Sequence, residues 1–362
     1  MRGALLSAVC SVAAALCAAP AWAQQSGMFK DWIVGCDEVR HCVAIGTSPV
    51  DAENHASLSL ARGGRGSDRV ERVLIAVDAE LEPSLRTTIS ADGEALGTLV
   101  AERVEDLDSE GNLLYVSRDP ALIASLLAAL RKAQVLELIH AGTTYRISLA
   151  GASAALLWID ERQARLDTVS AFVRKGSKAD DTVRPPTAPA PIRAAIDPAA
   201  AELDPRAAAA LAAPLRAGLP PDVCEEPNPD SALLDRAWRL DGEHQLLAIS
   251  CYSGAYNFTA YWYLIGRDGK ATPVAFHEAS DEVDGESEIN ALVNGDFDPA
   301  RATLSAFYKG RGIGDCGEIS ERVWNGRSLE LASQLFMTDC RLVPWSLWPQ
   351  LVKREVIGRP EP

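Results

Sequence analysis

The residues best suited to chemistry in this chain are Gly314-Asp315-Cys316-Gly317, which place a cysteine in a glycine-flanked turn. A thiolate there could act as a nucleophile if a histidine base and an oxyanion hole lay beside it. The alternative is a structural disulfide with Cys340, because a sulfur bonded to another sulfur cannot attack a carbonyl. We favour the disulfide, since the N-terminus predicts export to an oxidising compartment. The candidate bases are His41, His55, His140, His244 and His277.

Cysteine spacing supports a disulfide framework. Of the eight cysteines, Cys10 and Cys17 fall in the N-terminal segment that we expect to be removed. The other six allow fifteen pairings, but two lie early and four lie late in the chain. We predict three local pairs and no metal or cofactor, because CxxC and histidines at zinc-ligand spacing are absent. The predicted pairs are Cys36–Cys42, Cys224–Cys251 and Cys316–Cys340.

Two further stretches resemble ligand sites without their full pattern. The run beginning at Lys309, Lys-Gly-Arg-Gly-Ile-Gly, lacks the Lys-Ser/Thr ending and βαβ context of a phosphate loop, so it predicts a turn between strands. His277 precedes the acidic stretch 278–288, which lacks the ligand spacing of a calcium loop and predicts a solvated loop. Paired carboxylates for glycoside hydrolysis stay open, because sequence does not give their separation.

An aromatic strand is predicted over residues 256–265, and its side chains alternate between two faces. One set is typical of core: Tyr256, Phe258, Trp262 and Leu264. The other set could form a recognition face, because tyrosine joins apolar area to a polar tip: Asn257, Thr259, Tyr261 and Tyr263. We therefore predict a ligand site near Tyr256, Tyr261, Tyr263 and the turn from Arg311 to Asp315. In the alternative, the tyrosines are buried and Arg311 only braces its own loop.

The first 23 residues predict a secretory signal peptide. Arg2 precedes an apolar run from Ala4 to Ala19, and Ala21-Trp22-Ala23 matches the small-x-small cleavage pattern. Neither early cysteine follows the small residue that a lipoprotein signal needs. Later apolar runs are too short to span a bilayer. We therefore expect a periplasmic or secreted protein, cleaved after Ala23.

The charge of the chain limits its partners. The formal charge of the 362 residues is −15, and removal of Arg2 makes it −16. This charge argues against nucleic acid, whose binding rests on neutralising phosphates, and against docking on anionic lipid. It fits a solvated acidic surface or a basic partner.

Composition divides the mature chain into two predicted domains, 24–176 and 222–362, joined by a Pro/Ala-rich linker, 177–221. The run from Arg184 to Pro191 favours an extended linker. Asp204-Pro205 before an alanine run indicates a short helix within it. The sequence of the first domain predicts an α+β fold, with one helix that begins after Asp119 at Pro120 and a second helix after Gly151. Its expected strands are 32–36, 42–47, 57–61, 70–77, 113–117, 135–140 and 145–149.

The sequence of the second domain predicts a mainly antiparallel β fold, either a sandwich or a barrel-like meander. Asp-Gly and Asn-Gly pairs punctuate its strands, and such pairs favour the tight turns of hairpins. A short helix is expected over Pro344–Lys353. The expected strands are 244–252, 256–265, 272–277, 303–308, 318–324 and 329–337.

Four blocks carry a resemblance to a known family: Trp32–Cys36, Leu149–Arg165, Cys251–Asn257 and Lys309–Gly317. In this order they resemble the domain of unknown function 1176 family of secreted Gram-negative proteins. The first half is also similar to the invasion-associated locus B family, through its Trp-x-Val-x-Cys start. The main resemblance implies a periplasmic or exported protein and supplies no catalytic residue.

Together these features predict a non-enzymatic, disulfide-stapled envelope protein that binds an unknown envelope protein or polymer. Two alternatives stay open. One is a hydrolase of envelope polysaccharide or peptide. The other is an inhibitor of a basic secreted enzyme such as lysozyme, which rests on acidity and a small β architecture.

Overall fold

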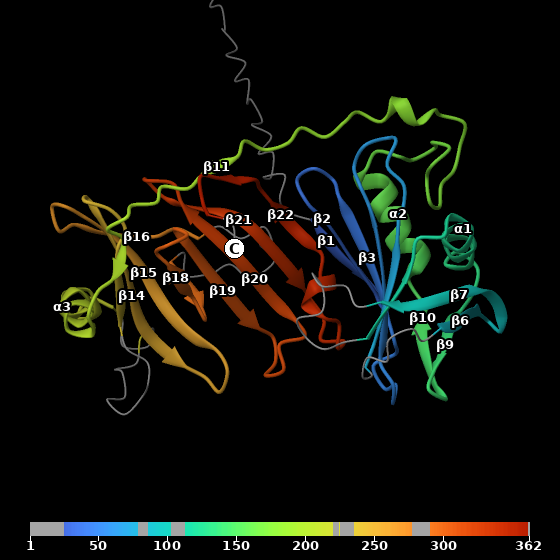
Figure 1. Ribbon diagram of the computed structural model, residues 1–362, viewed down its shortest axis with the longest axis horizontal. Helices are drawn as coiled ribbons and strands as arrows, with labels where there is room; N and C mark the ends of the chain where they lie inside the picture. Colours follow the sequence, from blue (N-terminus) through green and yellow to red (C-terminus); the bar gives the residue numbers. More distant parts are fainter. Residues whose placement is uncertain are drawn as a thin grey trace, which may run out of the picture.

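The computed structural model describes residues 25–78, 86–102, 113–219, 224, 235–276 and 290–360. This part of the chain is mostly β, with three α-helices, and its large sheets are antiparallel and open (Figure 1). The predicted β-rich character is therefore confirmed. Across the described helices, none combines the length and apolar character needed to cross a membrane.

The N-terminal half is built on one ten-stranded sheet in the order β1-β2-β3-β4-β5-β8-β7-β6-β9-β10. The sheet curls, so that β10 contacts β3 and β4 although it is not hydrogen-bonded to them. Its inner face holds the largest apolar cluster, which includes Trp32, Leu58 and Tyr115. The strands are Ser26–Phe29, Trp32–Cys36, Cys42–Thr47, Ala56–Arg62, Val73–Val77, Arg86–Ala91, Glu94–Glu102, Leu113–Ser117, Val135–His140 and Thr143–Ser148 for β1 to β10.

Two helices pack on this curled sheet, at the positions that the sequence predicts. Helix α1, Pro120–Ala129, begins after Asp119, whose carboxylate accepts a hydrogen bond from Ala121 N–H. Helix α2, Ala152–Arg162, follows Gly151, whose φ of 100° is costly for residues with a side chain. A Cβ there would lie 1.7 Å from the carbonyl oxygen of Phe29, so both backbone angle and space require glycine.

The predicted linker carries regular structure. After a short 3-10 helix, Asp180–Thr182, it contributes strand β11, Ile192–Arg193, which pairs in parallel with β23, Val356–Ile357. Strand β12, Ala201–Glu202, pairs with β13, Arg236–Arg239. Helix α3, Pro205–Arg216, then contacts β13 and β14. The segment runs along one edge of the molecule from α2 to the far sheet (Figure 1).

The C-terminal half contains two sheets around one apolar cluster. The first has the order β12-β13-β14-β15-β16, with β17 also paired to β15, and the second runs β18-β19-β20-β21-β22. Trp238 and Trp262 from the first sheet and Trp324 from the second share the cluster between them. The remaining strands are His244–Ser253, Phe258–Gly266, Ala271–Pro273, Ala291–Val293, Asp296–Asp298, Thr303–Lys309, Gly317–Trp324, Leu329–Met337 and Gln350–Lys353 for β14 to β22.

The predicted helix over Pro344–Lys353 is wrong. The structure has a 3-10 turn, Trp345–Leu347, and then strand β22, which pairs with β21. Pro349 lies between the two and has no N–H to continue a helix. The predicted strand 272–277 is also shorter: β16 ends at Pro273, and His277 lies outside the described residues.

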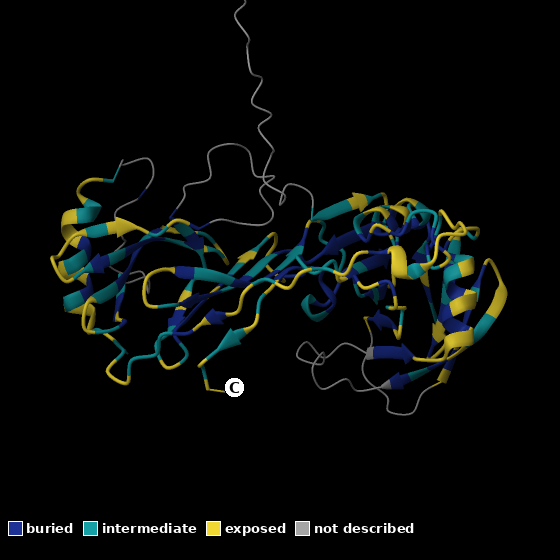
Figure 2. Ribbon diagram, turned by 90° about the horizontal axis from the view of Figure 1, so that it is seen from above, coloured by how far each residue is buried: buried dark blue, intermediate teal, exposed yellow. Residues whose placement is uncertain are grey.

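A shared apolar cluster joins the two halves, and dark blue, buried strands are present in both (Figure 2). Ile33 and Ile45 from the N-terminal sheet contact the cluster that contains Met337 and Trp348. A Cβ on Gly35 would lie 2.5 Å from the side chain of Pro349, so the backbones approach closely here. The division into two separable domains stays a prediction, because the halves share buried surface.

Candidate functional site

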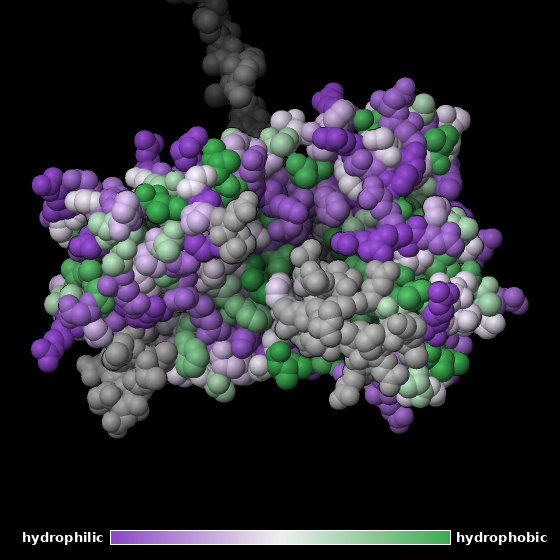
Figure 3. All heavy atoms as spheres, in the orientation of Figure 1, coloured by the Kyte–Doolittle hydropathy of each residue, from purple (hydrophilic) through white to green (hydrophobic). Residues whose placement is uncertain are grey.

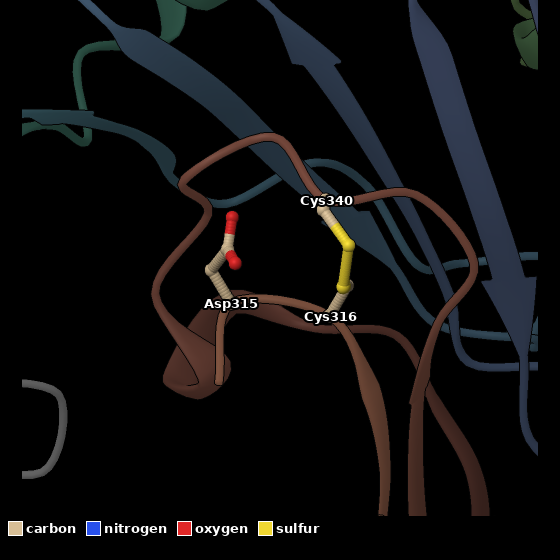
Figure 4. Close-up of side chains that lie close together, drawn as sticks. All are labelled: Asp315, Cys316 and Cys340. Carbon is tan, nitrogen blue, oxygen red and sulfur yellow. A yellow bond between two sulfur atoms is a disulfide. The ribbon is translucent and has the colours of Figure 1, made fainter. Parts of the chain in front are cut away.

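All three predicted disulfides are present: Cys36–Cys42, Cys224–Cys251 and Cys316–Cys340. Cys316, Cys340 and the carboxylate of Asp315 lie within 4.8 Å of one another (Figure 4). Because the two sulfurs are bonded to each other, neither is a thiolate for a metal or for nucleophilic attack. In the turn Gly314–Gly317, Cys316 is therefore part of a structural disulfide and not a nucleophile.

Asp315 and Arg311 brace the turn that precedes this disulfide. Arg311 donates from Nε and Nη2 to the two carboxylate oxygens of Asp315, at 2.7 and 2.6 Å. Leu342 N–H donates to the same carboxylate at 2.7 Å. Burial alone would raise the pKa of Asp315, but these hydrogen bonds lower it below its ordinary value. The ion pair is thus part of the turn, while Arg311 stays half-exposed at 44%.

Two of the predicted ligand-binding tyrosines are buried. Tyr261 is 5% exposed and Tyr263 is 8% exposed, in a cluster with Ala208 and Ala212 of α3 and the Cys224–Cys251 disulfide. The face of β15 that could have formed an open recognition face is therefore covered, which is the alternative in which these tyrosines are buried. The sequence does not reveal this cover, because it comes from the segment predicted to be a linker.

The opposite face of β15 is exposed at its start, where we expected core. Tyr256 and Phe258 are 38% and 40% exposed, because here the hairpin β14–β15 extends beyond the sandwich core. Green, hydrophobic side chains appear at the lower edge of Figure 3, near the β19–β20 turn. We define the aromatic end as the exposed large side chains of these two hairpins: Tyr252, Tyr256, Phe258, Tyr308 and Ile313.

Two half-buried amides hold the loops of the aromatic end together. Asn257 donates to the carbonyl of Lys309 and accepts from its N–H, at 2.9 and 3.2 Å. Asn294 donates to the carbonyl of Phe307 at 2.8 Å and accepts from Phe258 N–H at 3.0 Å. These bonds fix the β14–β15 hairpin to β19, so the aromatic side chains stand on a rigid frame. Asn294 and Tyr308 carry no local sequence signal for this role, because they lie far from the aromatic strand in the chain.

A cavity of about 490 Å³ opens beside Phe258. Its lining includes Trp238, Asn294 and Arg236, whose guanidinium makes a bidentate pair with Glu202 at 2.7 and 3.1 Å. The hydrogen bonds that Arg236 donates to Glu202, and a second ion pair with Asp296, raise the pKa of Arg236 above its ordinary value. The cavity therefore combines apolar wall with fixed polar groups, as ligand pockets do.

The predicted acidic loop, Glu278–Glu288, lies outside the described residues. The Gly-rich run from Lys309 forms the turn between β19 and β20, as predicted.

The family model described as "Protein of unknown function (DUF1176)" matches residues 26–353. Among curated proteins, the chain is 27% identical over 341 residues to the uncharacterized protein YpfG of Escherichia coli (strain K12), covering 86% of this chain and 88% of that protein. No solved structure matches the chain.

Proposed function

The chain belongs to the DUF1176 family of proteins of unknown function, and we propose that it is an exported, non-enzymatic protein that binds a partner protein of the cell envelope through its aromatic end. The observation that carries this proposal is the gathering of five exposed large side chains on two hairpins. Exposed apolar patches on otherwise soluble folds mark interaction sites.

The composition of the aromatic end favours a protein partner. Tyrosine and phenylalanine supply large contact areas at a low cost in side-chain entropy, and they are enriched where proteins bind each other. Ile313, at 68% exposure, has no ring to stack on a sugar but packs well into an apolar pocket. The neighbouring cavity beside Phe258 could receive one anchoring side chain of the partner.

Rigidity supports the same proposal. The amides of Asn257 and Asn294 and the Arg311–Asp315 pair fix the loops before any partner arrives. A preorganised surface loses less conformational entropy on binding. The disulfides support export, since such bonds persist in oxidising compartments. We place cleavage after Ala23 and the mature protein in the periplasm or outside the cell.

The proposal is tested by site-specific crosslinking in the native envelope. A photoreactive phenylalanine replaces Tyr308 in one version of the full chain and Val50, which is 72% exposed in the other half, in a second version. We expect one protein adduct from position 308 and none from position 50. Ile313→Ser should reduce the adduct at least fivefold, whereas Ile139→Ser, a matched exposed isoleucine at 58%, should not.

Three results would refute the proposal. Adducts of equal yield from positions 308 and 50 would indicate collision without recognition. An unchanged adduct in Ile313→Ser would place the contact elsewhere. Co-sedimentation with purified envelope polysaccharide, lost in Ile313→Ser, would replace the protein partner by a polymer.

A further inference from the structure

A second cavity lies in the N-terminal half, far from the aromatic end. It has a volume of about 400 Å³ and lies between helix α1 and the segment 169–175. Helix α1 lies at the opposite end of the molecule from the C-terminal sheets (Figure 1). We call this cavity the basic groove. Its lining includes the apolar side chains of Val70, Ile123 and Leu127 and the cations Arg69, Arg131 and Lys175.

One wall of the basic groove is a helix without any charged residue. The sequence of α1 is PALIASLLAA, and its exposed side presents Ala124 and Ala128 to the groove. A helix on a protein surface normally carries charged residues on its outer side, and a helix that is apolar all round is usually covered. Exposed Val169, at 53%, continues the apolar lining on the opposite wall.

A buried polar network fixes the floor. Arg62 is 2% exposed; it donates to Asp160 at 2.9 Å and to Gln163 at 2.7 Å, and its guanidinium lies 3.4 Å from the centre of the Phe172 ring. Asp160 also accepts from Phe172 N–H and Val173 N–H, at 2.8 and 2.9 Å. The groove wall from 169 to 175 is therefore held in place by α2.

The charged residues that line the groove are all cations. Four cations line it, and the described lining contains no aspartate or glutamate. Arg62 is paired with Asp160, and exposed Arg69 is paired with Asp180 at 2.6 Å. Arg131 and Lys175 are exposed and form no ion pair within the described residues. This is an unusual surface for a chain whose formal charge is −15.

We propose that the basic groove binds a single amphiphile with an anionic head, an alkyl phosphate or a long-chain carboxylate. The head contacts Arg131 and Lys175, where its charge is complementary, and the apolar tail lies along Val70, Ile123 and Leu127. The volume lies within the range of small-molecule sites, and apolar lining with few polar groups is typical of them. The proposal is independent of the proposed function at the aromatic end.

The proposed binding of an anionic amphiphile is tested by calorimetry. Dodecyl phosphate, below its micellar concentration, is titrated into the full mature protein. We expect saturable one-to-one binding, with at least tenfold weaker binding of dodecyl maltoside, which has a neutral head, and of inorganic phosphate, which has no tail. Arg131→Gln should weaken binding about fivefold, and the added Lys175→Gln about fivefold again. Lys132→Gln, an exposed neighbour outside the lining, is the matched control.

A substitution that fills the groove tests the location without changing charge. Ala128→Trp should abolish binding, whereas Ser125→Trp, exposed on the same helix but outside the lining, should not. Equal affinity for dodecyl maltoside, equal affinity for inorganic phosphate, or normal binding in the Arg131/Lys175 double variant would each overturn the proposal. Sedimentation with phosphatidylglycerol vesicles, without binding of dodecyl phosphate, would replace it by docking on a membrane surface.

Discussion

Asp37 should make the folded protein less stable as the pH rises. Its side chain is 5% exposed in the turn closed by the Cys36–Cys42 disulfide. One carboxylate oxygen accepts hydrogen bonds from Val39 N–H at 3.0 Å and His41 N–H at 2.7 Å. Burial nevertheless raises the pKa of Asp37 from its ordinary value of 3.8 to about 6, because these bonds only partly offset the lost hydration.

The size of the effect follows from this difference in pKa. Between about pH 4 and about pH 6 the folded protein binds more protons at Asp37 than the unfolded chain, so the free energy of unfolding falls as the pH rises. Above about pH 6 the full cost is present, at most about 3 kcal/mol. Asp37→Asn removes this cost and leaves an amide oxygen for both N–H donors.

Urea denaturation at about pH 4 and about pH 8 measures the effect. We expect Asp37→Asn to match the parent protein near pH 4 and to be more stable by about 2 to 3 kcal/mol near pH 8. Asp51→Asn, at an exposed position, is the control and should change stability by less than about 0.5 kcal/mol at either pH. A stability difference between the Asp37 variant and the parent that does not change with pH would refute the reasoning.

Three further tests of the framework each measure stability by urea denaturation. Asp160→Asn should cost about 3 to 5 kcal/mol, because it leaves a buried guanidinium without its counter-charge. Gly317→Ala should cost more than about 3 kcal/mol, since φ is 126° and a Cβ would lie 2.0 Å from a carbonyl oxygen, whereas Gly93→Ala, with open space around it, should cost about 1 kcal/mol. Replacing Cys316 and Cys340 together by serine should cost about 3.5 kcal/mol, from the entropy of the loop that their disulfide closes.

Elements with a local sequence signal could be located from the sequence alone. Helices α1 and α2 and strands such as β2 and β3 follow capping residues, alternation or apolar runs, and they lie where predicted. Strands β6 and β7 were missed, because Arg86–Ala91 and Glu94–Glu102 mix polar and apolar residues and are stabilised by pairing with β9 and β8. Strands of two residues, such as β11, exist only through distant partners.

The aromatic strand shows why the site was only partly predictable. Alternation correctly separated Tyr261 and Tyr263 from Trp262, but it cannot say which face is covered. That depends on where α3 packs, and its alanine-rich sequence within the predicted linker indicates a helix but not the sheet that the helix covers. The exposed side chains of the aromatic end come from residues more than fifty positions apart, Tyr252 and Tyr308, which only the sheet arrangement brings to one end.

The blocks that carry the family resemblance divide between two structural tasks. Leu149–Arg165 supplies Asp160 and Gln163, which hold Arg62 and with it the floor of the basic groove. Cys251–Asn257 and Lys309–Gly317 build the aromatic end, where Asn257 joins one block to the other through Lys309. These two blocks also place Tyr252, Tyr256 and Ile313 on the surface, where they belong to the partner site that we propose. The same set of blocks thus braces the basic groove in the N-terminal half and the aromatic end in the C-terminal half.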